Sequence, residues 1–149
     1  LYETGYLKKA RKARKNLAVS KPLLFTTSEG VKGYIGKNNM QNDQLTFKTS
    51  SPSDEWFHAK DMPGSHVILQ TAGLTLGKDY TEQSLLEAAA MAAAHSKGAA
   101  GNNVPVDHTK RRYVKKPAGS IPGFVIYTHQ QTIYVRAEAM EAARRQLSE

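Results

Sequence analysis

The alternation of apolar and polar positions predicts a domain built from short strands and one substantial helix. Short apolar runs rich in β-branched and aromatic residues recur along the chain, separated by glycine, proline or asparagine. Such runs are typical of strands joined by turns, whereas the alanine-rich segment after Thr81 has the length of a helix. We therefore expect an α+β fold, with a mainly antiparallel sheet of six or seven short strands and the alanine-rich helix packed on it.

The first 21 residues have the spacing of an amphipathic helix. Four apolar residues recur at helical intervals, namely Tyr6, Ala10, Ala13 and Leu17. Pro22 ends the pattern, because proline lacks the backbone donor that a helix needs. We expect a basic helix at 1–21, which either packs along the domain or ends an arm from upstream, then a folded domain at 22–136 and a polar helical tail at 137–149. Because the chain begins at a leucine, we expect it to be part of a longer protein.

Residues 36–39, with the sequence GKNN, combine a glycine, a lysine and two asparagines that can cap a helix. Asn38 or Asn39 can begin a short helix, running to about Phe47, by accepting a free first-turn amide. Together with Lys37, the free amides could hold a phosphate. An ordinary capped turn is the alternative, since the stretch lacks the full Walker A pattern.

A second stretch, DEWFHAKDMPGSHVIL, predicts a hairpin between residues 55–60 and 66–71, because a Pro-Gly pair favours a turn. If Lys60 pairs with His66, side-chain alternation places six residues on one face. These six are Trp56, His58, Lys60, His66, Ile68 and Gln70. The opposite face is entirely apolar and belongs to the core, so the first face is a candidate contact surface. Burial of Trp56 is the alternative, because a lone tryptophan is more often packed than displayed.

The alanine-rich helix has recognisable ends. Thr81 is the expected N-cap, with Glu82 near the positive end of the helix dipole. At the other end we expect His95 as a C-terminal cap, Lys97 in the last turn and Gly98 in the left-handed position that follows a helix.

Turn signals place the remaining strands. A turn at Glu29-Gly30 joins two strands near the start of the domain, and three more follow the long helix. The expected strands lie at 23–27, 32–36, 111–117 (RRYVKKP), 124–128 (FVIYT) and 132–137 (TIYVRA).

The net charge of +8 is concentrated in two places. Seven basic residues and one acid occupy the first 21 positions, and five basic residues crowd into KRRYVKK at 110–116. Lysines and arginines that neutralise phosphates release counterions, so two such segments favour a polyanionic partner. A solvated helix and a solvated strand are the alternative interpretation.

Several other classes of function lack support. There is no cysteine, which excludes disulfides and thiolate metal sites and fits a reducing compartment. The histidines lack metal-ligand spacing, and Ser65 and His66 are consecutive strand residues that point to opposite faces, which spoils a nucleophile–base pair. Asp54, Asp61 and Asp107 are expected beside turns, bonded to backbone. We expect no enzyme activity, metal, cofactor, small-molecule substrate or membrane partner.

Nucleic-acid binding fits the residues better. Trp56 or Tyr113 could stack a base, and the two histidines of the hairpin could donate to phosphate or 2′-hydroxyl groups. Five cations could lie along phosphates, namely Lys60, Arg111, Arg112, Lys115 and Lys116.

Four ordered segments resemble the NFACT-R domain, the RNA-binding module of the ribosome quality-control NFACT proteins. They are LLFTTSEGVKGYIGKNNMQNDQLTFK, DEWFHAKDMPGSHVIL, AAAHSKG and RRYVKKPAGSIPGFVIYTHQQTIYV, within residues 22–136. The resemblance implies a cytoplasmic protein whose partners are tRNA and the large ribosomal subunit with its rRNA. Full-length members support alanine extension of stalled chains, which needs an N-terminal domain that this chain lacks. The basic helix resembles the end of their coiled-coil arm.

Combined with that resemblance, the residues give a set of predicted RNA-binding positions. They are Lys37, Asn38, Asn39, Trp56, His58, Lys60, Ser65, His66, Lys97, Arg111, Arg112, Lys115 and Lys116. Two alternatives remain open. The family is also labelled fibronectin-binding protein A-like, which suggests a surface adhesin that binds fibronectin, and the same basic surface could bind DNA.

Overall fold

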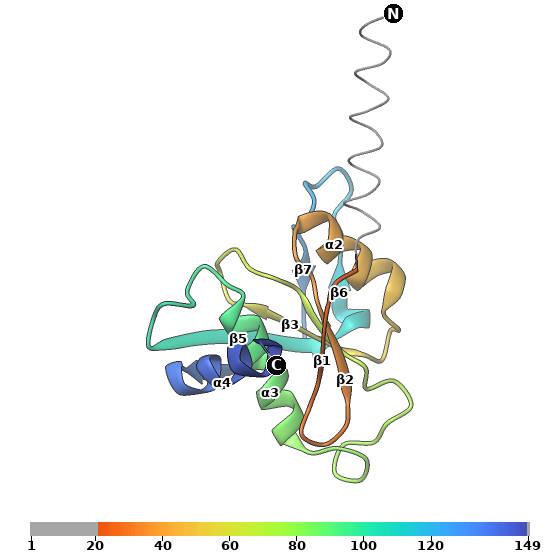
Figure 1. Cartoon of the computed structure of the whole chain (residues 1–149). Coiled ribbons are helices and arrows are strands. Elements are labelled where there is room, and N and C mark those ends of the chain that lie inside the picture. Colours follow the sequence, from red (N-terminus) through yellow and green to blue (C-terminus); the bar gives the residue numbers. More distant parts are fainter. Residues whose placement is uncertain (1–20, 149) are drawn as a thin grey trace, which may run out of the picture.

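The computed structural model describes residues 21–148, so the basic helix expected at 1–21 lies, apart from Lys21, outside the described residues. Strands and helices form an α+β domain, as predicted (Figure 1). The eight strands are β1 (Leu23–Thr26), β2 (Lys32–Ile35), β3 (Glu55–Ala59), β4 (Val67–Leu69), β5 (Asn103–Lys110), β6 (Val114–Lys115), β7 (Ile126–Tyr127) and β8 (Gln131–Arg136). Six of them form an antiparallel sheet in the order β1-β2-β4-β3-β5-β8, and β6 and β7 form a small second sheet.

Over residues 21–148, three helices accompany the strands. They are α2 (Asn39–Gln44), α3 (Glu82–Ala94) and α4 (Ala137–Ser148). A π-helical segment, η1 (Leu45–Thr49), continues α2, and a 3₁₀ turn, η2 (Arg111–Tyr113), follows β5. The helical tail therefore begins at the expected residue, Ala137. The strand expected at 111–117 is instead the 3₁₀ turn followed by the two-residue strand β6. Strand β5 was not predicted from the sequence.

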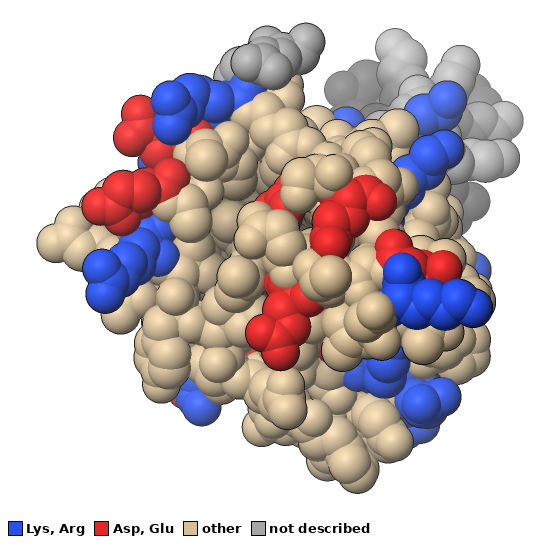
Figure 2. Space-filling model, turned by 90° about the horizontal axis from the view of Figure 1, so that it is seen from below, with Lys and Arg blue, Asp and Glu red and all other residues tan. Residues whose placement is uncertain are grey.

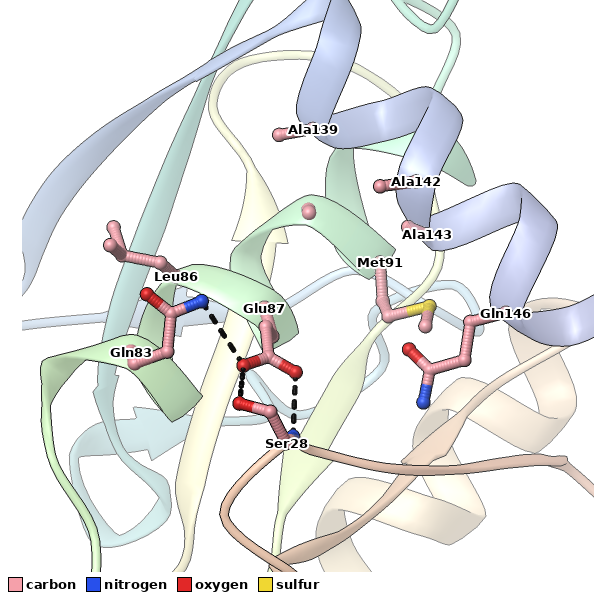
Figure 3. Close-up of a pocket in the computed structure, with 10 residues that line it drawn as sticks. Ser28, Gln83, Leu86, Glu87, Met91, Ala139, Ala142, Ala143 and Gln146 are labelled. Atoms are coloured by element: carbon pink, nitrogen blue, oxygen red, sulfur yellow. Dashed lines mark hydrogen bonds between the residues drawn. The ribbon is translucent and has the colours of Figure 1, made fainter.

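Helix α3 covers one face of the large sheet. Its alanines allow a close approach, because a methyl side chain keeps the helix backbone near the strands. Ala88 and Ala92 are fully buried in the same cluster as Phe57, Val67 and Val106 of the sheet. Helix α4 packs against α3, and a groove of about 460 Å³ between them is closed at one end where Glu87 accepts hydrogen bonds from Ser28 and Gln83 (Figure 3).

The second face of the sheet is also covered. Trp56 and Ile68 pack there with Leu45 of η1 and Val114 of β6. The α2–η1 segment and the small β6–β7 sheet therefore form a third layer over the strands.

The hairpin between β3 and β4 has a different register from the one predicted. Phe57, not Ala59, lies opposite Val67, a shift of two residues that keeps every side chain on its predicted face. Beyond Phe57, β3 no longer pairs with β4, and the Lys60 N–H donates to Pro105 O on the β5 side. The connection is held instead by a bridge between Gly64 and Ser96.

The two ends of α3 agree with the sequence in part. Thr81 is the N-cap and accepts a hydrogen bond from the Gln83 N–H. His95 ends the helix, and its Nδ1–H donates to Met91 O at 2.9 Å. However, the helix stops before Lys97, and Gly98 does not adopt the left-handed conformation, because the His95 and Ser96 side chains bond the last carbonyls directly.

A carboxylate from the β1–β2 turn also caps α3. Glu29 accepts hydrogen bonds from the backbone N–H and hydroxyl of both Thr81 and Ser84, at 2.7–3.1 Å. Bonds from Thr81 and then Ser84 lower the pKa of Glu29 to about 2, because they favour the ionised form. The turn and the start of the helix are thereby tied together.

This cap predicts an acid-sensitive contribution to stability. Since the folded pKa of Glu29 lies below its ordinary value of 4.5, the contribution is present above pH 4.5 and is lost as the pH falls towards 2. We expect Glu29→Gln to lower the melting temperature near neutral pH, with a difference from wild type that shrinks over this interval. Circular dichroism melts across a pH series measure it, with Glu141→Gln on the exposed face of α4 as the control. A difference that does not change with pH would contradict the assignment.

Candidate nucleic-acid interface

A shallow pocket brings together five of the thirteen predicted RNA-binding residues. It has a volume of about 340 Å³ and is formed by three separate segments of the chain. Its polar side chains are Lys37, Asn38, Asn39, Asn42, Ser65, His95 and Lys97. We call it the Lys37–Lys97 pocket.

The GKNN stretch forms one wall through a local capping arrangement. Asn38 caps α2, and its Oδ1 accepts from the Gln41 N–H at 2.9 Å, which confirms the predicted cap. In return, Gln41 Oε1 accepts from the Lys37 N–H at 2.9 Å, as in a capping box. This arrangement fixes the backbone of Lys37 and leaves its side chain exposed.

A backbone contact brings the second lysine to the pocket. The Ser65 N–H donates to His95 O at 3.0 Å, and the Lys97 N–H donates to Pro63 O at 2.9 Å. Gly64 permits this approach, because a Cβ at that position would lie 3.1 Å from the Ser96 Cα. Lys97 is therefore placed beside the GKNN stretch by residues far from both in sequence.

The charge of the pocket has one sign. Among the described residues that line it there are two lysines and no aspartate or glutamate. The carboxylates of Glu29 and Glu87 lie instead around the β1–β2 turn and α3, and that of Asp43 in α2 is paired with Lys116. Figure 2 shows the lower face of the domain, with acidic side chains in its middle and a mixture of basic and acidic ones towards its edges. The pocket is thus the better place for an anion.

The prediction that Trp56 and His66 lie on an exposed contact face is wrong. Trp56 and His66 are both 0% exposed, because the third layer covers the face that carries them. Trp56 packs against the rings of His58, His66 and Tyr127, with centroids 4.8–5.8 Å apart. Neither ring can reach a ligand, so both belong to the second core.

The two histidines of this cluster are held neutral. Burial lowers the pKa of His66 to about 3, and burial also lowers that of His58, which is half-buried. His66 Nε2–H donates to Gly123 O at 3.3 Å, while Nδ1 lies 2.9 Å from the Thr46 hydroxyl. A carbonyl can only accept, so Nδ1 is the acceptor for Thr46. His66 is therefore neutral and carries no charge to a ligand.

The basic segment 110–116 is not a uniform cationic strand. Arg111 donates from Nε to Thr46 O at 2.6 Å, and Lys110 pairs with Glu55 at 3.3 Å. Lys116 lies 3.2 Å from Asp43 and donates to two carbonyls of the following loop. Lys110 thus links two strands of the sheet, Arg111 ties the end of β5 to η1, and Lys116 ties the loop after β6 to α2. Arg112 and Lys115 remain exposed, as does Lys60, which lies in the turn after β3.

Tyr113, the other candidate for base stacking, is half-buried and already stacked. Its ring lies 3.9 Å from that of His129, with an angle of 23° between the planes. One of its faces is therefore occupied within the domain.

Comparisons with known proteins place these features in a family. A family model described as the NFACT protein RNA-binding domain matches residues 21–123. The chain belongs to the NFACT RNA-binding domain family. Its relatives include proteins named Rqc2 homolog RqcH from Bacillus subtilis, 42% identical over 93% of this chain, and Streptococcus suis, 42% identical over 91%. The chain spans 24% of the length of each.

A solved structure shares the fold of this NFACT-R domain. It is that of the C-terminal part of the fibronectin/fibrinogen-binding protein from Streptococcus suis, with a TM-score of 0.73 and 37% identity. The match covers 83% of this chain and 49% of that one. The resemblance inferred from sequence is thus confirmed.

Sequence reasoning missed two members of the pocket and two buried networks. Asn42 and His95 line the Lys37–Lys97 pocket, but an asparagine inside a helix and a capping histidine give no signal of a site. Asp107, expected beside a turn, lies within β5 and accepts from the hydroxyls of Tyr127 and Thr132 at 2.6–2.7 Å. Asp54, by contrast, bonds backbone N–H groups as expected.

The second network couples the Glu55 carboxylate to a histidine and a lysine across β3 and β5. Glu55 accepts from His108 Nδ1 at 2.8 Å and pairs with Lys110. Burial raises the pKa of Glu55, but the bonds from His108 and the charge of Lys110 outweigh it and lower the pKa overall. Within residues 21–148, no three metal-ligating side chains lie close enough to hold an ion. Over the same residues, no helix has the length and apolar character of a membrane span.

Proposed function

We propose that this domain is the non-enzymatic RNA-binding module of a ribosome quality-control factor. In this proposal it contacts tRNA or the rRNA of the large ribosomal subunit, and the Lys37–Lys97 pocket receives a backbone phosphate. Chain extension belongs to other parts of the full-length protein. The observation that carries the proposal is the convergence of two lysines, from segments far apart in sequence, on a pocket with no carboxylate among its described lining residues.

The chemistry of the pocket suits a phosphate. Lysine ammonium groups provide point charges that bind phosphate, and the Asn39 amide and Ser65 hydroxyl can add directional hydrogen bonds. The exposed cations Arg112, Lys115 and Lys60 would extend contact along a polyanion. Such contacts position a nucleic acid and give affinity without reading its sequence.

Salt dependence tests the proposal. We expect tRNA to bind the purified domain with an affinity that falls as salt rises. Lys37→Gln and Lys97→Gln should each weaken binding and make the log–log salt slope shallower by about one. Fluorescence anisotropy at several salt concentrations measures both quantities.

A matched control is available at the acidic end. Lys78 is exposed and lies between β4 and α3, so Lys78→Gln should leave affinity and slope nearly unchanged. Competition by duplex DNA and by fibronectin distinguishes RNA from the other candidate partners. Equal effects of all three lysine variants, or no binding at low salt, would refute the proposal.

A further inference from the structure

We propose that the loop beside the Lys37–Lys97 pocket is a stacking platform for an unpaired base, so that the domain prefers single-stranded RNA segments over duplex. The β6–β7 loop comprises residues 116–125, and the base would stack on Phe124. This inference rests on the proposed function and adds the class of RNA that the site takes.

The loop displays apolar side chains to solvent. Ile121 is 72% exposed and Phe124 is 51% exposed, and Ile126 at the start of β7 and Met40 in α2 are also exposed. By contrast, Phe25 and Phe57 are buried. A displayed phenylalanine with apolar neighbours is the kind of surface that marks an interaction site.

The loop is held in one conformation by contacts from three directions. Lys116 Nζ donates to Phe124 O at 3.0 Å and also to Ile121 O. The Gly123 N–H donates to Asp43 at 3.0 Å, and Gly123 O accepts from His66 at 3.3 Å. Phe124 is therefore presented on a rigid support, which lowers the entropy cost of binding.

The loop and the pocket are neighbours. A Cβ added to Gly123 would lie 2.6 Å from Asn39 Oδ1, and Asn39 also lines the pocket. Figure 1 shows the loop running beside α2 at the upper end of the domain. One nucleotide strand can thus place a phosphate in the pocket while a base of the same strand meets the Phe124 ring.

This combination selects for unpaired RNA. Bases in a duplex are already covered by their neighbours in the stack, whereas bases in single strands and loops can turn out onto an aromatic ring. Every base offers a π-face, so stacking on Phe124 would tolerate any sequence. The pocket alone would bind phosphates of single-stranded and duplex RNA alike, so the preference for single strands comes from the Phe124 ring.

The test uses the domain with a single-stranded RNA of about 12 nucleotides, within the site size of such modules, and the same sequence annealed as a duplex. We expect tighter binding of the single strand. Phe124→Ala should weaken it by about fivefold to 150-fold, while the duplex affinity and the salt slope stay unchanged. Phe124→Trp should retain binding, and its added indole fluorescence should be quenched by the single strand.

The outcomes separate this inference from the proposed function. Salt-dependent binding of both RNA forms with no effect of Phe124→Ala would overturn the stacking platform and leave the proposed function standing. If Phe124→Ala spares RNA binding but reduces co-sedimentation with ribosomes, the loop contacts a protein and the inference is wrong. Absence of RNA binding in every variant would remove the proposed function itself.

Discussion

Trp56→Ala is expected to lower the free energy of unfolding by about 3–5 kcal/mol, the range for deleting a fully buried large aromatic side chain. Trp56 is 0% exposed and packs between the sheet and its third layer. Its removal would leave a cavity bordered by His58, His66 and Tyr127. Urea denaturation followed by circular dichroism measures the change.

Two further variants make this result specific. Trp56→Phe keeps most of the apolar volume and should cost less than the alanine variant. Phe124→Ala removes an exposed ring and should change stability by no more than about 0.5 kcal/mol. If Trp56→Ala proves as stable as Phe124→Ala, the tryptophan is not a core residue, and its role as a contact residue would be restored.

This prediction also bears on how loss of RNA binding is interpreted. A Trp56 variant that no longer binds RNA would look like a lost contact, although the indole cannot touch a ligand in the fold. Its affinity per folded molecule should stay close to wild type under conditions where it remains folded. Pocket variants such as Lys97→Gln should show the opposite pattern, with stability retained and affinity reduced.

Alternation correctly showed which residues share a face, but it could not show what covers that face. Phe57 and Val67 were assigned to the core from their period of two, and they lie there. Trp56 and His66 alternate with them and were predicted to face a ligand. The third layer that buries them comes from segments before and after the hairpin, and the hydrogen bonds of His66 to Thr46 and Gly123 compensate for burying a polar ring.

The missed strand β5 has a similar explanation. Its sequence, NVPVDHTK, contains a proline and several polar residues, which argue against a central strand when only local propensity is considered. In the fold, Asp107 and His108 are both buried and each has a hydrogen-bond partner, Tyr127 and Glu55 respectively. Tertiary hydrogen bonds thus overrode the local pattern, and only the neighbouring strands could have revealed it.

Only the part of the candidate site formed by consecutive residues could be predicted from the sequence. The cap at Asn38 and the exposure of Lys37 follow from four consecutive residues. The position of Lys97 depends on the bridge between Gly64 and Ser96, a contact between segments that no local pattern links. The resemblance supplied Ser65 and Lys97 as family motif residues, and the structure explains how they come to lie beside GKNN.

The second large expected effect is on stability, and it distinguishes the adjacent residues Lys115 and Lys116, which have different roles in the fold. Lys116 pairs with Asp43 and bonds two loop carbonyls, whereas Lys115 is exposed. We expect Lys116→Met to lower the free energy of unfolding by about 1.5–3 kcal/mol, the range for hydrogen bonds to charged groups. Lys115→Met, a matched substitution one residue away, should leave it nearly unchanged.

The two variants should also affect RNA binding in different ways. Lys116→Met loosens the loop that presents Phe124, so it should weaken binding of single-stranded RNA without changing the salt slope. Lys115→Met removes a free charge and should make the slope shallower if that lysine lies along the RNA. Urea denaturation and anisotropy titrations on the same two proteins measure both properties. Equal stability of the two variants would show that Lys116 does not anchor the loop. A shallower slope for Lys116→Met would show that Lys116 contacts phosphate directly.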